Sequence, residues 1–236
     1  MEQTALWIAR PEGAAVRLRL PPRLASWNAV GDPAPVRLAA ALADAEELLT
    51  PMIDRLNGPL ALQLDVGLTA TVPLLAHHDL DNYLFPLAVH LMKRPDMAIV
   101  SVWGTKRHGA TSTVRVAPAA VTSERLAADF VGAVRTTASA STTVFKQQIS
   151  DQLSCASELP PGPVALELAF EVGARRNWLN LWKPTIDALD RLLGRTFATR
   201  SWHPRDGRIT ELGLHCSADH TLGNDVVVHI AARSLG

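Results

Sequence analysis

The chain lacks the features that define several common classes of protein. Only two of its 236 residues are cysteine, Cys155 and Cys216, which is too few for a disulfide scaffold. No uninterrupted apolar run approaches the roughly 20 residues that a transmembrane helix needs. The first residues carry neither a basic segment nor an apolar core of the secretory type. We therefore expect reduced thiols, a cytoplasmic location and no membrane contact.

Several signatures of catalysis and ligand binding are also missing from the sequence. No glycine-rich loop of the phosphate-binding type is present, which disfavours the use of ATP or NAD. There is no Gly-x-Ser-x-Gly motif, which α/β-hydrolases use to position their nucleophile. The two cysteines are far apart in the sequence, and His77-His78 lacks the spacing of a zinc-binding set. A structural zinc site is therefore not expected.

Charge is scarce and evenly balanced. The chain has 23 basic and 23 acidic side chains, so its formal net charge is zero, and apolar residues make up 47% of it. A chain of this composition buries enough apolar surface to fold, which excludes intrinsic disorder. A neutral protein has no overall attraction to nucleic acid, so any such contact must depend on a local patch.

The most informative feature that is present is an internal repeat. Residues 58–64 read Gly-Pro-Leu-Ala-Leu-Gln-Leu and residues 162–168 read Gly-Pro-Val-Ala-Leu-Glu-Leu, and both segments are typical of buried strands. A second shared block follows each strand, at 80–88 and at 178–186, with asparagine and proline at the same spacing. Chance similarity between two ordinary stretches is the alternative, but the order of the blocks favours duplication.

The remaining elements fit two similar units. In each copy, two strands are predicted after the shared helical block, at 98–103 and 112–116, and at 208–213 and 225–230. An amphipathic helix is predicted over 32–56, with Pro51 expected to kink or split it, and another over 143–153. Residues 15–20 alternate like an edge strand. We therefore predict an α+β fold of two β-α-β-β units, residues 1–118 and 119–236.

A pair of carboxylates lies between a strand and a helix in the first unit. Asp79 and Asp81 flank one apolar residue, and Asn82 follows them directly. Two carboxylates at this spacing can share a hard divalent cation such as Mg²⁺, with the asparagine as a further oxygen ligand. Alternatively, the aspartates cap the helix by accepting hydrogen bonds from its first N–H groups. The motif alone does not decide between these interpretations.

One segment of the second unit is strongly basic. Residues 175–208 contain eight basic and three acidic side chains, a local excess of +5 (8 − 3). Aromatic residues are interleaved with the basic ones at Trp178, Trp182, Phe197 and Trp202. Such a mixture suits a phosphate backbone with unpaired bases, and it equally suits a solvated face above an aromatic core. A smaller basic group, Lys106 and Arg107, is predicted in a turn between two strands.

These motifs together resemble the RusA family of Holliday-junction resolvases. In that family an Asp-x-Asp-Asn-x-x-Lys motif opens a helix, and a third aspartate follows before the next strand. The first copy carries the Asp-x-Asp-Asn part at 79–82. The second carries the Asn-x-x-Lys part at 180–183 and the late aspartate at Asp206. Residues 20–28 are similar to the family's first strand and turn. Because that family is homodimeric, the chain resembles two divergent RusA-like copies fused into an internal pseudo-dimer that can act as a monomer.

Neither copy holds the complete motif. The first has Phe85 in place of the lysine, and its best match for the late aspartate is Asp96. The second has Asn177 and Leu179 in place of the two aspartates. The complete set therefore requires residues from both copies. The split motif indicates either one composite site or the loss of both sites.

The resemblance implies a divergent, Mg²⁺-dependent, structure-selective DNA endonuclease of recombination and repair, acting on branched or single-stranded DNA. Its metal ligands would be Asp79, Asp81 and Asp206, and Lys183 would complete the catalytic set by stabilising charge on the phosphate or the leaving oxygen. The residues expected to contact nucleic acid are Arg175, Arg176, Lys183, Arg205, Arg208, Lys106 and Arg107. The alternative is a RusA-like module that binds nucleic acid or protein without cleavage. An unrelated chemistry on the same scaffold is a third possibility, because fold does not fix function.

Overall fold

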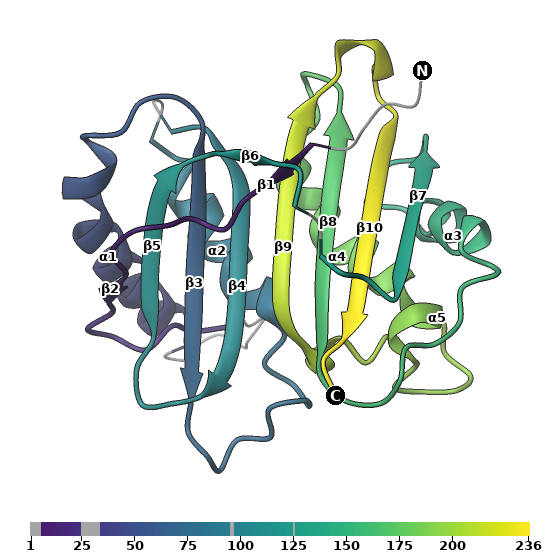
Figure 1. Cartoon of the computed structure of the whole chain (residues 1–236), viewed down its shortest axis with the longest axis horizontal. Helices are drawn as coiled ribbons and strands as arrows, with labels where there is room; N and C mark the ends of the chain where they lie inside the picture. Colours follow the sequence, from purple (N-terminus) through teal and green to yellow (C-terminus); the bar gives the residue numbers. More distant parts are fainter. Residues whose placement is uncertain (1–5, 25–33, 95–96, 125) are drawn as a thin grey trace.

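The computed structural model describes residues 6–24, 34–94, 97–124 and 126–236, which form a mixed α+β fold around one large sheet. The sheet has eight strands in the order β2-β5-β3-β4-β9-β8-β10-β7 (Figure 1). Across the sheet, these strands are β2 (Val16–Arg17), β5 (Thr113–Pro118), β3 (Leu60–Leu68), β4 (Ile99–His108), β9 (Ile209–Ala218), β8 (Val164–Val172), β10 (Val226–Ser234) and β7 (Phe130–Thr136). A separate ribbon pairs β1 (Trp7–Ile8) with β6 (Val121–Thr122).

The pairing pattern of the sheet repeats about its centre. Strand β3 is parallel to β4 and antiparallel to β5, and β8 is likewise parallel to β9 and antiparallel to β10. The two sets meet where β4 and β9 pair antiparallel, with Ser101 opposite His215 and Thr105 opposite Glu211. These six strands are the ones that the repeat predicts. Both halves of the chain therefore contribute to one continuous sheet.

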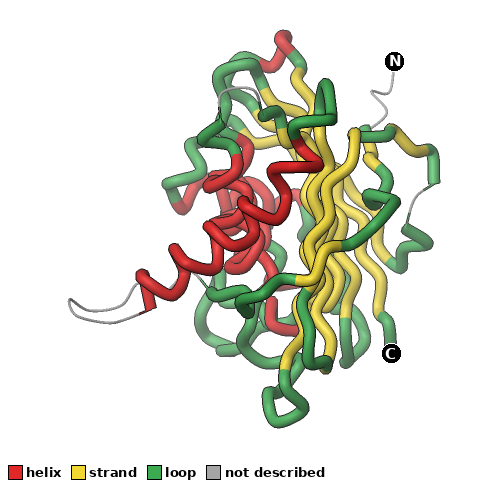
Figure 2. Tube along the Cα trace, turned by 90° about the vertical axis from the view of Figure 1, so that its left-hand side faces the viewer, coloured by secondary structure: helices red, strands yellow, loops and turns green. Residues whose placement is uncertain are grey.

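The α-helices lie on one face of this sheet, as its edge-on view shows (Figure 2). They are α1 (Ala34–Ile53), α2 (Leu80–Leu91), α3 (Thr143–Gln152), α4 (Trp182–Ala188) and α5 (Asp190–Leu193). Short 3₁₀ turns, η1 (Trp178–Leu181), η2 (Asp206–Arg208) and η3 (His220–Leu222), precede α4, β9 and β10. In the described part of the chain, no helix combines the length and apolar character needed to cross a membrane.

Some predicted elements differ from the observed ones. Pro51 does not split the first helix, because it lies in the last turn of α1, which ends two residues later. The predicted start of that helix, at residue 32, lies outside the described residues. The predicted strand 15–20 is shortened to the two residues of β2. Strands β1, β6 and β7 were not predicted.

The core fills the space between the sheet and the helices. Apolar residues of the central strands, such as Leu62 and Leu64 of β3, are buried in this core. Helix α2 packs closely on β4, because a Cβ at Gly104 would lie 2.8 Å from Leu84 Cδ1. The helices α2 and α4 meet at the middle of the sheet, where Phe85 contacts Trp182 edge to face. The N-terminus of α2 is thereby fixed next to the second half of the chain.

Candidate metal centre

Three carboxylates converge where the two halves of the chain meet. Asp79 is the N-cap residue of α2, Asp81 lies in its first turn, and Asp206 begins η2 just before β9. One oxygen from each carboxylate lies within 4.8 Å of the other two. The Asp81 side chain is buried, and the other two are half-buried. Two ligands thus come from the first copy and one from the second.

The geometry of Asp79 argues against helix capping as the role of its side chain. Asp79 occupies the N-cap position with an extended backbone, but its side chain accepts no capping hydrogen bond from the helix. Its Oδ2 instead accepts a hydrogen bond of 3.2 Å from Asn82 Nδ2. In the second copy the equivalent N-cap residue, Asn177, does accept a bond of 3.1 Å from the Leu179 N–H. Capping is therefore not what holds the Asp79 carboxylate at this site.

A buried lysine ties together the two loops that carry the carboxylates. Lys106, on β4, donates hydrogen bonds to the carbonyl oxygens of His78 at 3.0 Å and Gly207 at 2.6 Å. His77 and His78 both have left-handed backbone angles, with φ of 60° and 54°. Gly207 allows the close approach of these loops, because a Cβ there would lie 2.9 Å from the His77 nitrogen. Burial lowers the pKa of Lys106 to about 8, against the attraction of the nearby carboxylates.

A second lysine, Lys183 of α4, lies among the carboxylates. Its Nζ is 2.5 Å from Asp206 Oδ2 and 3.9 Å from Asp81 Oδ2. It also lies 3.3 Å from Asp187 Oδ1, one helical turn further along α4. Burial opposes the charge of Lys183, but these carboxylates outweigh it and raise the pKa above its ordinary value. Sequence reasoning missed Asp187, although its i, i+4 spacing from Lys183 is the usual signal for such a pair.

The electrostatics of the cluster favour an added cation. Burial raises the pKa of Asp81 to about 7, and the charges of Asp206 and Asp79 add to this effect while Lys183 opposes it. The pKa of Asp79 is also raised, first by burial and then by Asp206. Like charges held this close resist ionisation unless a cation compensates them. Carboxylate oxygens are the ligands that Mg²⁺ and Ca²⁺ prefer, so the donor set fits a hard divalent cation.

Two of the expected nucleic-acid contacts have a different role in the structure. Arg208 is buried and its guanidinium donates to main-chain carbonyls, including that of Gly162 at 2.8 Å and that of Leu193 at 3.3 Å. Lys106 is likewise buried and bonded to carbonyls. Neither side chain is available to a phosphate on the surface. The prediction that these two residues contact nucleic acid is therefore wrong, because both hold loops in place.

The other predicted contacts remain on or near the surface. Arg107 and Arg175 are exposed. Arg205 is exposed and forms an ion pair with Glu158. Arg176 is half-buried and donates to the Ala138 carbonyl at 2.8 Å. Most of the interleaved aromatics are less accessible: Trp178 and Trp182 belong to the core, whereas Phe197 is exposed and Trp202 half-buried.

The match to the RusA motif can be followed only in part. Asp96 and residues 25–28 lie outside the described residues. Asn177 and Leu179 stand at the start of η1, where they supply no carboxylate. The structure thus brings Asp79, Asp81 and Asp206 together with Lys183, as the composite set requires. Comparisons with protein-family models, curated proteins and solved structures find no match to this chain.

Proposed function

We propose that the protein is a Mg²⁺-dependent, structure-selective DNA endonuclease with one composite active site, built as a RusA-like internal pseudo-dimer. The observation that carries this proposal is the convergence of Asp79, Asp81 and Asp206 beside Lys183, from two halves of the chain. Each half alone is incomplete. A set of carboxylates with one lysine matches what hydrolysis of a phosphodiester needs.

In this proposal the roles of the side chains follow from their positions. Asp79, Asp81 and Asp206 hold the metal ion, which when bound polarises the scissile phosphate and lowers the pKa of an attacking water. Lys183 donates to the phosphate or to the leaving oxygen, where negative charge develops. The hydrogen bonds of Lys106 keep the two ligand-bearing loops at a fixed separation. Arg107, Arg175, Arg176 and Arg205 supply the contacts to the DNA backbone.

A specific observation supports a second candidate, a binding module that does not cleave. The Lys183 ammonium lies 2.5 Å from Asp206, where it neutralises one carboxylate without any metal. The pKa of about 7 for Asp81 lets that side chain stay neutral at moderately acid pH. Both features reduce the negative charge that an added cation has to compensate. Such a module would bind branched DNA or a protein partner in recombination or repair.

Junction cleavage distinguishes the two candidates. A four-way junction with one labelled strand is incubated with MgCl₂ and either wild-type protein, Asp81→Asn or Asp54→Asn. Asp54 is an exposed carboxylate after α1, so its variant matches the charge change away from the site. We expect cleavage by the wild type and by Asp54→Asn, and its loss in Asp81→Asn with junction binding retained. Equal cleavage by all three would remove the assignment, and binding without cleavage by the wild type would support the second candidate.

A further inference from the structure

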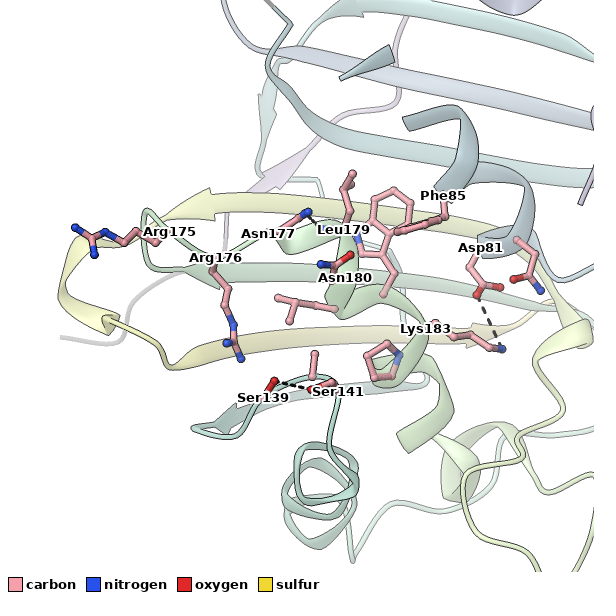
Figure 3. Close-up of a pocket in the computed structure, with 15 residues that line it drawn as sticks. Asp81, Phe85, Ser139, Ser141, Arg175, Arg176, Asn177, Leu179, Asn180 and Lys183 are labelled. Atoms are coloured by element: carbon pink, nitrogen blue, oxygen red, sulfur yellow. Dashed lines mark hydrogen bonds and ion pairs between the residues drawn. The ribbon is translucent and has the colours of Figure 1, made fainter. Parts of the chain in front are cut away.

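A cavity of about 720 Å³ adjoins the metal centre. At one end it is lined by Asp81 and Lys183, and at the other by Arg175 and Arg176 (Figure 3). Its middle is apolar and includes Phe85 of α2. The cavity therefore connects the carboxylates to a cationic end through an apolar middle. Its volume is within the range of pockets that enclose small organic ligands.

The repeat explains why the middle of this cavity is apolar. Asp79 and Asn177 are the N-cap residues of the equivalent segments α2 and η1. Counting from them, Leu179 stands at the position of Asp81. Leu179 lines the middle of the cavity, whereas Asp81 lies at the end that adjoins the metal centre (Figure 3). The second copy thus has an apolar side chain where the first has a buried carboxylate.

The lysine of the motif is replaced in the same way, by an apolar residue in the other copy. Phe85 follows Asp79 by six residues, as Lys183 follows Asn177. The metal centre combines the aspartates of the first copy with Lys183 of the second. The cavity combines the start of η1 in the second copy with Phe85 of the first. The middle of the cavity is therefore the counterpart of the metal centre, with Leu179 in place of Asp81 and Phe85 in place of Lys183.

The aromatic ring in the cavity is both accessible and held in position. Phe85 is 36% exposed, and its ring contacts the fully buried Trp182 edge to face, with centroids 6.2 Å apart. An aromatic face of this kind can stack on a nucleobase whatever its sequence. The exposed side chain of Asn180, on the cavity wall, offers amide donors and acceptors to a base edge.

The far end of the cavity suits a phosphate group. The Nη2 of Arg176 donates to the Ala138 carbonyl at 2.8 Å, which fixes the guanidinium. Its buried Nε has no hydrogen-bond partner among the described residues. Arg175 beside it is exposed. Two guanidinium groups at this end provide positive charge for a phosphodiester.

We propose that this cavity binds an unpaired nucleotide of the DNA substrate, with its base stacked on Phe85 and a backbone phosphate at Arg175 and Arg176. The inference rests on the proposed function and deepens it, since it names the feature of branched DNA that the protein recognises. The cavity reaches Asp81, so a strand with one phosphate at the carboxylates can place a neighbouring base in it. One half of the pseudo-dimer then cuts, and the other half selects for unpaired DNA.

Binding without metal tests this inference separately from cleavage. The probes are a fluorescein-labelled forked duplex with unpaired arms and the same fork with abasic sites in those arms. Anisotropy titrations in EDTA are made with wild type, Phe85→Ala and Phe85→Trp. Val121→Ala is the control, because Val121 is an exposed apolar residue that does not line the cavity. Thermal unfolding of each variant verifies that it is folded.

We expect Phe85→Ala to raise the Kd for the normal fork at least about fivefold, the lower end of the effect of removing one stacking side chain. Phe85→Trp and Val121→Ala should bind like the wild type. The abasic fork should bind the wild type more weakly by a similar factor and show no further loss with Phe85→Ala, a comparison that holds even if that variant is less stable.

The outcomes separate the two proposals. Equal binding of both forks by the wild type overturns the nucleotide pocket, even where Mg²⁺-dependent cleavage is present. Binding that depends on Phe85 and on the bases retains the pocket, even where the wild type cleaves nothing and the endonuclease is lost. Absence of binding to either fork overturns the pocket as well.

Discussion

Replacing Asp81 by asparagine should stabilise the metal-free protein at neutral and alkaline pH. Burial raises the pKa of Asp81 from 3.8 to about 7, so ionisation of this carboxyl is unfavourable in the folded state. At about 1.36 kcal/mol per unit of pKa, the difference amounts to about 4 kcal/mol. The contribution of the protonated Asp81 to stability is fully present below about pH 4 and is lost as the pH rises from there through 7. Asparagine does not ionise, so the variant lacks this loss.

The assay is urea unfolding in EDTA between pH 5 and pH 8. Over this interval the wild type should lose roughly 2–3 kcal/mol relative to Asp81→Asn, because part of the loss has already occurred by pH 5. For a chain of this length the difference corresponds to about 5–10 °C in Tm. Asp54→Asn, a change at an exposed carboxylate, should follow the wild type.

Addition of MgCl₂ should narrow this difference in stability. A ligand that binds only the folded state stabilises it by mass action, and Asp81→Asn has lost one ligand oxygen. The wild type should therefore gain stability with Mg²⁺ at pH 8, and the variant should gain much less. Parallel pH profiles of wild type and Asp81→Asn in EDTA would refute the reasoning, because they would mean that Asp81 ionises freely in the folded protein.

Other substitutions should separately change Mg²⁺ affinity, stability and the salt dependence of DNA binding. Asp206→Asn should weaken Mg²⁺ affinity and lower the pKa of the Lys183 ammonium, measurable by calorimetry and by NMR titration of that lysine; an unchanged pKa would mean that the 2.5 Å contact does not form. Lys106→Ala should cost about 1–3 kcal/mol in urea unfolding, because it leaves buried carbonyls without a donor, whereas Arg175→Ala should leave stability unchanged. Arg175→Ala should instead reduce the salt dependence of DNA binding by roughly one counterion, and Arg208→Ala should leave that slope unaltered; the opposite result would reverse their roles.

The sequence predicted the central part of the fold because the repeat constrains it twice. The strand at 58–64 and its copy at 162–168 share apolar alternation and a Gly-Pro start, and they became β3 and β8 at the same place in each half. The elements missed have no such support. Strands β1 and β6 are two residues long and exist only because they pair with each other across the sequence. Such pairing depends on the path of the whole chain.

The burial of two basic residues could not be predicted from composition. Arg208 and Lys106 look like surface residues in a basic segment, and nothing local marks them as buried. Their burial is favourable because carbonyl groups from distant loops converge on each cation, as Gly162 and Leu193 do on Arg208. A charge is retained in the interior only where such partners are supplied by the tertiary structure. Counting charges along the chain therefore overestimates the basic surface of the protein.

The two N-cap residues show a difference in the site that the sequence does not predict. Aspartate and asparagine are about equally good helix caps, so the letters at 79 and 177 predict the same role. In the structure Asn177 caps its helical turn, whereas Asp79 leaves its own uncapped and faces Asp81 and Asp206. Asp206 lies near Asp79 in the tertiary structure, and the sequence around residue 79 does not reveal this proximity. Two equivalent elements can thus differ in role, with one N-cap side chain capping its helical turn and the other joining a cluster of carboxylates.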